Sequence, residues 1–155
     1  MYPSPYVVFK SARQEYEWHN STPRQETHPV VHPALYVVVL AAAHWHYLRV
    51  GKPVVLTHIL RTRREQRAIY PDRPGLRSPH EFGRAADLRT RHLELQVARE
   101  WEEWINRSFP YYGRPQSATA QLHEVGSRGL HLHLQVGPRE KHPPWPETFP
   151  QRVQI

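Results

Sequence analysis

Residues 130–136 read Leu-His-Leu-His-Leu-Gln-Val, so apolar and polar side chains alternate at every position. Side chains two residues apart point to the same side of a β-strand, which predicts that the leucines enter a core while His131 and His133 share the other face. The segment therefore predicts a strand that is buried on one side. Two imidazoles on one face can share a metal ion, and the alternative interpretation is an exposed strand face with incidental histidines.

The flanking sequence predicts the elements around this strand. Apolar and β-branched runs predict further strands at residues 6–9, 54–59, 85–89 and 118–124, the last joined to 130–136 by a turn at 126–129. Helical spacing of apolar residues predicts helices at 34–49, 63–70 and 91–106, while residues 11–32 are expected to be loop with room for a short helix. This order predicts an α+β fold, in which a small, mainly antiparallel sheet carries helices on one face and a site on the other.

The composition is that of a single packed domain over residues 1–155. With 39% hydrophobic and 23% charged residues, the chain is neither disordered, nor collagen-like, nor a coiled coil. It has no cysteine, so a metal ion would have to be bound by carboxylates and by some of the 12 histidines. We expect a monomer whose motif-bearing core spans residues 54–137, followed by a proline-rich tail that cannot join a sheet interior.

No segment has the features of a membrane anchor or a secretory signal. The longest stretch without charged side chains, residues 27–48, contains Pro29, Pro33 and four histidines, which leaves too short an apolar run to span a bilayer. The first ten residues lack the basic start, apolar middle and cleavage site of a signal peptide. The sequence therefore predicts a protein that is made in the cytoplasm and has no transmembrane segment.

Positive charge is concentrated in the middle of the chain. The net charge is +7 with histidine neutral, and residues 51–100 carry eleven basic and six acidic side chains. Such an excess can bind nucleic-acid phosphates, an anionic cell envelope or substrate carboxylates, and it can equally be a solvated basic surface. The arginines concerned are Arg61, Arg63, Arg64, Arg67, Arg73, Arg77 and Arg84.

A second segment supplies candidate partners for the histidine pair. Residues 78–87 read Ser-Pro-His-Glu-Phe-Gly-Arg-Ala-Ala-Asp and match the pattern Ser-x-His-x-x-Gly-x-Ala-x-Asp at all five fixed positions. Together with His-Leu-His at 131–133, this segment resembles the signature of the zinc D-alanyl-D-alanine metallopeptidase and Hedgehog-like superfamily. The resemblance implies a zinc ion held by His80, Asp87 and His133, with a water molecule in the open fourth position. His133 is chosen over His131 because the sequence from His133 to Val136 resembles the end of the family's last strand.

The resemblance also implies roles for residues around the zinc ion. Arg61 and Thr62 resemble the family's pair of arginine and Ser/Thr after its first core strand, which implies that Arg61 contacts the substrate and stabilises the oxyanion. The alternative is a surface arginine at the start of a helix. Ser78 is expected to order the loop that carries His80, or to contact the substrate.

The residue expected to act as general base differs from that of many family members. Many members carry Asp or Glu three residues before the last zinc-binding histidine, a position that Leu130 occupies here. In this region the sequence is closer to penicillin-insensitive murein endopeptidases and Hedgehog signalling domains, which carry a histidine where His131 stands. Glu124 is the nearest carboxylate that could reach across the turn, so we expect His131 and Glu124 to share the role of general base. His58 and His123 either line the cleft or belong to ordinary polar packing.

The function implied by the resemblance is zinc-dependent hydrolysis of a peptide bond in the stem or cross-link of bacterial peptidoglycan, by a carboxypeptidase or an endopeptidase acting at the cell wall. Both a D-Ala-containing bond and an L-Ala-D-Glu bond stay open, and a short chain without a signal fits a phage endolysin by analogy. The competing hypotheses are a non-catalytic, zinc-stabilised binding domain of the Hedgehog-like type and a nucleic-acid-binding protein that uses the arginines. We favour the peptidase and expect no nucleic-acid partner. We expect residues 71–78, residues 106–116 and the amino-terminal segment to form the substrate pocket.

Overall fold

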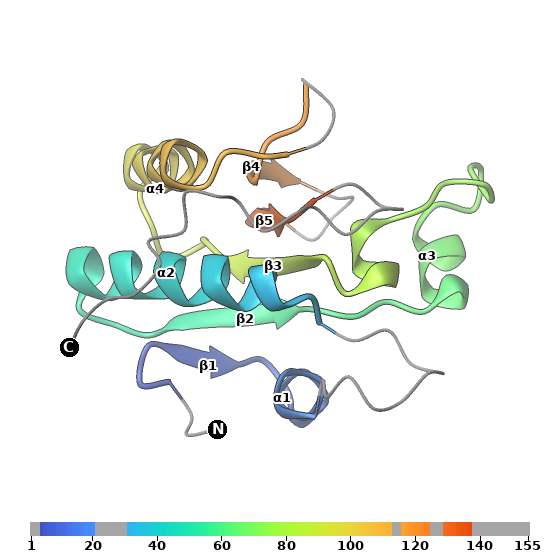
Figure 1. Cartoon of the computed structure of the whole chain (residues 1–155), viewed down its shortest axis with the longest axis horizontal. Helices are drawn as coiled ribbons and strands as arrows, with labels where there is room; N and C mark the ends of the chain where they lie inside the picture. The colour runs from blue at the N-terminus through green and yellow to red at the C-terminus, as the bar shows by residue number, and fades with distance from the viewer. Residues whose placement is uncertain (1–3, 21–30, 113–115, 125–128, 138–155) are drawn as a thin grey trace.

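A five-stranded sheet runs through the middle of the molecule (Figure 1). The computed structural model describes residues 4–20, 31–112, 116–124 and 129–137. In chain order, its elements are β1 (Val7–Phe9), α1 (Ala12–His19), α2 (Pro33–Val50), β2 (Val54–His58), α3 (Arg63–Ile69), the short 3-10 helix η1 (Pro79–Phe82), β3 (Ala85–Arg89), α4 (Leu95–Ser108), β4 (Ala120–Glu124) and β5 (Leu130–Gln135). The α+β fold predicted from the sequence is confirmed.

The strands follow the order β1-β2-β3-β5-β4. β1 is parallel to β2, and the other neighbouring pairs are antiparallel. The register places Asp87 opposite His133 and Arg89 opposite His131, and it places His123 of β4 opposite His131. Because directly opposite residues of antiparallel strands share a face, the polar side chains of three neighbouring strands gather on one side of the sheet.

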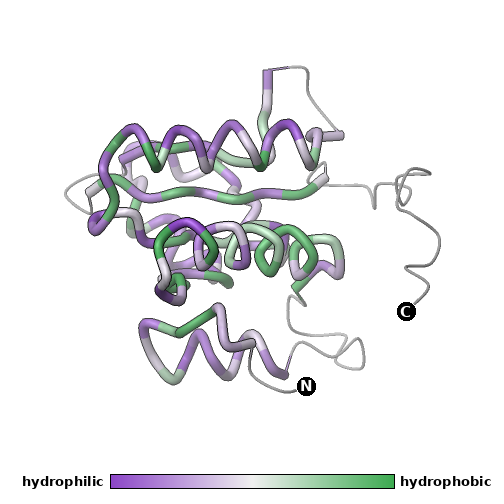
Figure 2. The backbone as a smooth tube through the Cα atoms, turned by 90° about the vertical axis from the view of Figure 1, so that its left-hand side faces the viewer, coloured by the Kyte–Doolittle hydropathy of each residue, from purple (hydrophilic) through white to green (hydrophobic). Residues whose placement is uncertain are grey.

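The other face of the sheet is apolar and is covered by helices. Trp101 of α4 is fully buried there and donates its indole N–H to the carbonyl oxygen of Ala42 in α2, at 3.0 Å. In Figure 2, α4 lies at the top and alternates hydrophilic and hydrophobic residues along its length, as expected for a helix with one buried stripe. The sheet contributes fully buried leucines to this core: Leu56, Leu88, Leu132 and Leu134.

Several boundaries differ from the predicted ones because local hydrogen bonds, and not apolar periodicity, decide them. The helix expected at 91–106 begins at Leu95, since the Thr90 carbonyl accepts from Leu93 N in a turn and the Thr90 hydroxyl donates to the Leu130 carbonyl. α1 is the short helix for which the loop expected at 11–32 left room. Residues 126–128 of the expected turn and the tail from Pro138 lie outside the described residues. In the described part of the chain, no helix is long and apolar enough to cross a membrane.

The start of α3 is fixed by a capping box, which gives a first prediction. The Thr62 hydroxyl accepts from Glu65 N at 3.2 Å, and the Glu65 carboxylate accepts from Thr62 N at 2.7 Å. We expect Thr62→Ala to lower the free energy of unfolding by about 1 kcal/mol, because the Glu65 N–H loses its acceptor and the Glu65 carboxylate loses the hydroxyl that donates to it. Urea denaturation measures it, with Thr62→Ser as the control that keeps the hydroxyl. Equal stability of the two variants would contradict the prediction.

A buried histidine of α2, His46, predicts a loss of stability in acid. His46 is fully buried; its Nδ1 donates to the Lys52 carbonyl at 2.9 Å, so its Nε2 accepts from His92 Nε2, 2.8 Å away. Burial lowers the pKa of His46 below its ordinary value. The unfolded chain therefore binds more protons below about pH 6.5, and the free energy of unfolding falls as the pH drops from there toward the lowered pKa of the folded state.

Other histidines contribute to the same loss of stability, because the pKa values of His58, His80 and His123 are also lowered. The variant His46→Gln removes only the contribution of His46. We expect the metal-free variant to lose less stability than the metal-free wild type between about pH 7.5 and about pH 5, by at most about 1.4 kcal/mol per pH unit. Chemical denaturation at both pH values measures the difference. Parallel pH profiles for the two proteins would show that His46 does not contribute.

Candidate metal centre

His80 is brought over the open face of the sheet by η1, and each residue of its motif has a local reason. Ser78 is buried and caps this turn: its hydroxyl accepts from His80 N at 3.4 Å, while the Glu81 carboxylate accepts from Ser78 N at 2.8 Å. Gly83 ends the turn with a φ of 63°, a left-handed conformation that favours glycine. Of the two expectations for Ser78, the contacts described here support the ordering of the His80 loop.

Three residues from three elements converge at one point. His80 Nε2 lies 3.3 Å from Asp87 Oδ1, and His133 Nδ1 lies 2.9 Å from the same oxygen. One ligand atom from each of the three residues lies within 4.8 Å of the other two. All three side chains are buried, with exposed fractions of 2% for His80, 8% for Asp87 and 7% for His133. This triad of His80, Asp87 and His133 could hold a metal ion.

The protonation of the triad fits a bound cation. His80 Nδ1 lies 2.7 Å from the carbonyl oxygen of Ile59, which can only accept, so this nitrogen carries the proton of the neutral ring. His80 Nε2 then points a lone pair at the Asp87 carboxylate. Two facing lone pairs need either a cation between them or a proton on Nε2, and burial disfavours that proton because it lowers the pKa of His80. The set of two nitrogens and one carboxylate oxygen is one that zinc accepts.

The charge state of Asp87 supports the same conclusion. Burial by itself would raise the pKa of Asp87, but the surrounding histidines His80 and His133 outweigh it and hold the pKa well below its ordinary value. Asp87 is therefore a carboxylate and His80 a neutral imidazole at neutral pH. These are the forms in which both side chains bind metal ions.

Arg61 lies beside the triad, anchored by its neighbours. Its Nη1 donates to Gln66 Oε1 at 2.8 Å and its Nε donates to His58 Nε2 at 3.3 Å, and the side chain is largely buried. His58 lies opposite Asp87 in the register, and its ring centroid is 4.9 Å from that of His80. Burial, with the influence of His80, lowers the pKa of His58 to about 3, so His58 is neutral and accepts from Arg61.

A second pair of histidines borders the triad on β4 and β5. His131 Nδ1 donates to the Gly129 carbonyl at 3.2 Å, which leaves a lone pair on Nε2; this nitrogen lies 3.1 Å from His123 Nε2 and 3.7 Å from Asp87 Oδ1. His123 therefore donates to His131. Burial, with the influence of His133 and His131, lowers the pKa of His123 to about 4, which keeps it neutral.

Glu124 is not brought to the triad. It lies opposite Leu130 and next to His123 on β4, so the two side chains face opposite sides of the sheet. Glu124 shares its side with Ala120 and Leu122, which lie opposite the core residues Leu134 and Leu132 of β5. Its side chain is exposed at the end of the strand. The expectation that Glu124 reaches the site is therefore not supported by the register, because neighbouring residues of a strand face opposite sides.

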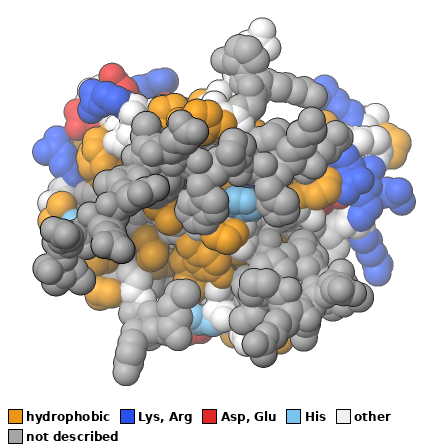
Figure 3. Space-filling view, in the orientation of Figure 1, with side chains coloured by type: hydrophobic (Ala, Val, Ile, Leu, Met, Phe, Trp, Pro, Cys, Tyr) orange, Lys and Arg blue, Asp and Glu red, His pale blue; other side chains and the backbone are white. Residues whose placement is uncertain are grey.

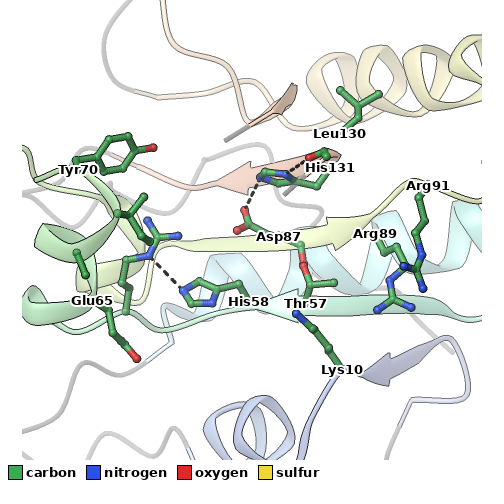
Figure 4. Close-up of a pocket in the computed structure, with 14 residues that line it drawn as sticks. Lys10, Thr57, His58, Glu65, Tyr70, Asp87, Arg89, Arg91, Leu130 and His131 are labelled. Atoms are coloured by element: carbon green, nitrogen blue, oxygen red, sulfur yellow. Dashed lines mark hydrogen bonds and ion pairs between the residues drawn. The ribbon is translucent and has the colours of Figure 1, made fainter. Parts of the chain in front are cut away.

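A cavity of about 1100 Å³, which we call the site cleft, opens beside the triad. Its lining includes Arg61. Figure 4 shows His58, Asp87 and His131 along one part of the cavity and Lys10, Arg89 and Arg91 along another. Residues 71–78 and the described part of 106–116 do not line this cavity, which takes its remaining wall from α3 and from residues 129–130. The contribution expected from the amino-terminal segment is made by Lys10.

Part of the arginine excess has structural roles. Figure 3 shows lysine and arginine side chains gathered at the α3 end of the molecule. Arg63, the first residue of α3, donates to the carbonyl oxygens of Leu76 and Pro74, at 2.8 and 2.5 Å, and pairs with Glu81 at 3.4 Å. Arg63 therefore fastens the loop before η1 to α3.

No protein-family model, curated protein or solved structure matches the chain. The chemistry of the triad and of the cleft beside it is therefore what indicates a function.

Proposed function

We propose that this protein is a zinc-dependent peptidase that hydrolyses a peptide bond in bacterial peptidoglycan. The observation that carries the proposal is the buried triad of His80, Asp87 and His133, of which Asp87 lines an open cleft. A structural zinc site is usually closed by four protein ligands, whereas a catalytic site leaves a position for water or substrate. The triad offers three ligands beside a cleft, which supports a catalytic site.

The chain's own residues supply the other groups that peptide hydrolysis needs. When bound, zinc supplies a Lewis acid that polarises the substrate carbonyl and lowers the pKa of water. Arg61 keeps its charge and is held by Gln66 and His58, so it can donate to the carbonyl oxygen as negative charge develops there. His131 Nε2 carries a lone pair near Asp87, so it can accept a proton once His123 turns its N–H away. The proposal assigns the proton acceptor to His131 and gives Glu124 no part in it.

One observation favours a second candidate function, a zinc-stabilised binding domain without hydrolysis. The position expected to carry an acid is Leu130, and β4 directs Glu124 to the other face. His131 is then left as the proton acceptor, and its Nε2 already accepts a hydrogen bond from His123. A protein that kept the metal site and lost the base would have this arrangement.

The experiment that separates the two functions is mass spectrometry of purified peptidoglycan incubated with zinc-loaded protein, beside a His133→Ala control. New peptide termini that are absent from the control are the result expected of a peptidase, and they identify the bond that is cut. Intact muropeptides from a wild type shown to carry about one zinc per chain would reject hydrolysis in favour of the binding domain.

A further inference from the structure

The site cleft continues past the triad to three cationic side chains. Lys10 follows β1, Arg89 ends β3 and Arg91 comes two residues later. We propose that Lys10, Arg89 and Arg91 form an anion subsite that binds a carboxylate of the peptide substrate, two or three residues away from the bond that lies at the triad. This inference rests on the proposed peptidase function and names the charge that its substrate must carry.

The strand geometry gives the spacing. Arg89 lies two residues after Asp87 on β3, so both side chains share the open face and their Cα atoms are about 6.6 Å apart. Arg91 lies in the turn that follows β3, and Lys10 is held beside β2 because its N–H donates to the Leu56 carbonyl at 2.9 Å. In Figure 4 the side chains of Arg89 and Arg91 point to the same region, across the cleft from Tyr70. An extended peptide advances about 3.3 Å per residue, so two or three residues span from the triad to the subsite.

The three cations lack the carboxylate partners that other basic residues have. Arg13, Arg49, Arg63 and Arg77 each form an ion pair with a glutamate. Within the described residues, no such pair involves Lys10, Arg89 or Arg91. Like charges that share one region without a counter-ion repel each other, and a bound anion would relieve that repulsion.

The positive potential of the subsite also acts on a neighbouring histidine, His92. His92 lies close to it, and the pKa of His92 is lowered, chiefly by burial and then by Arg89, Lys52 and Arg91. The repulsion that disfavours a proton on His92 is the field that attracts a carboxylate.

A discrete carboxylate fits the cleft better than a nucleic-acid backbone. The same cavity is lined by the acidic side chains Glu65 and Asp87, and Glu65 stays ionised because Arg13 lowers its pKa to about 2. A polyanion laid along the cleft would meet these carboxylates, whereas a single anionic group would meet only the cationic end.

The test compares one peptidoglycan stem tetrapeptide, with its side carboxylates free, with its fully amidated counterpart. We expect wild-type protein to show a kcat/KM about tenfold higher for the free acid, and we expect the ratio to approach one when Arg89→Gln and Arg91→Gln are combined. Arg99→Gln, an exposed arginine of α4 that does not line the cleft, is the matched control and should keep the wild-type ratio. The single variant Lys10→Gln, at an exposed position, provides the same comparison if the double variant does not fold.

Calorimetric binding of the same two peptides to metal-free protein separates the subsite from the peptidase. Preferential binding of the free acid, lost in the arginine variant, supports the subsite even if no peptide is cut. Equal cleavage of both peptides overturns the subsite and leaves the peptidase standing. Equal or absent binding of both peptides overturns it as well. Tighter binding of a single-stranded oligonucleotide, lost in the same variant, would assign the three cations to a nucleic acid instead.

Discussion

Replacing His133 by alanine is expected to abolish stoichiometric zinc binding and, with it, peptidase activity. His133 supplies one of the three ligand atoms of the triad, and no other histidine in the described residues completes such a group with His80 and Asp87. Losing a residue that only supports a ligand costs about 10–100-fold in metal affinity or activity, so losing a ligand itself should cost more. The zinc content after gel filtration and the release of peptidoglycan fragments measure the two effects.

A third measurement does not depend on activity. A ligand that binds only the folded state stabilises it, by about 2.7 kcal/mol when its free concentration is 100 times Kd. Zinc should therefore raise the Tm of the wild type and leave that of His133→Ala unchanged. His44→Ala is the matched control, because His44 is an exposed histidine on α2, away from the open face.

Two outcomes would contradict this prediction. Wild-type zinc content in His133→Ala, combined with its loss in His131→Ala, would move the ligand to His131. Unchanged zinc content in both variants would place the metal elsewhere in the chain.

The sheet could be predicted because it depends on short-range patterns, and the resemblance carried by residues 78–87 and 131–133 implied the triad. Alternation in residues 130–136 determines which side chains of β5 share a face, and the spacing from Ser78 to Asp87 places a capped turn and a strand one after the other. Convergence of His80, Asp87 and His133 then needs only that β3 and β5 be neighbours.

The rest of the site depends on features that a sequence pattern does not contain. Lys10 reaches the cleft because β1 pairs in parallel with β2, a long-range choice with no local signal. His58 faces Asp87 because the register shifts at an irregularity between Leu56 and His58, which changes the face expected from simple alternation.

For Glu124, in contrast, the alternation of side chains along the strand was enough to predict its position. His123 and Glu124 are neighbours on one strand, so they cannot both face the site. The pairing of His123 with His131 decides that the histidine faces it. The alternation along β4 therefore predicts the position of Glu124 better than its closeness in sequence to His131 does.

Arg61→Gln is expected to lower kcat by about 10²–10³-fold while the zinc content stays that of the wild type. The guanidinium lies beside the triad and lines the site cleft, so its positive charge can stabilise the negative charge that develops on the carbonyl oxygen during hydrolysis. An interaction made only in the transition state affects kcat and leaves KM nearly unchanged. Steady-state kinetics on a soluble stem peptide measures both constants.

The structural role of Arg61 must be separated from this electrostatic one. Its Nη1 donates to Gln66 Oε1 in α3, so Gln66→Ala tests what the loss of that contact does while the charge is kept. We expect Gln66→Ala to lower the thermal stability more than it lowers kcat, and Arg61→Lys to recover part of the activity that Arg61→Gln loses, because lysine restores the charge without the planar fork. If Arg61→Gln raised KM alone, or if Gln66→Ala lowered kcat equally, Arg61 would act as a support for α3 and the oxyanion would need another donor.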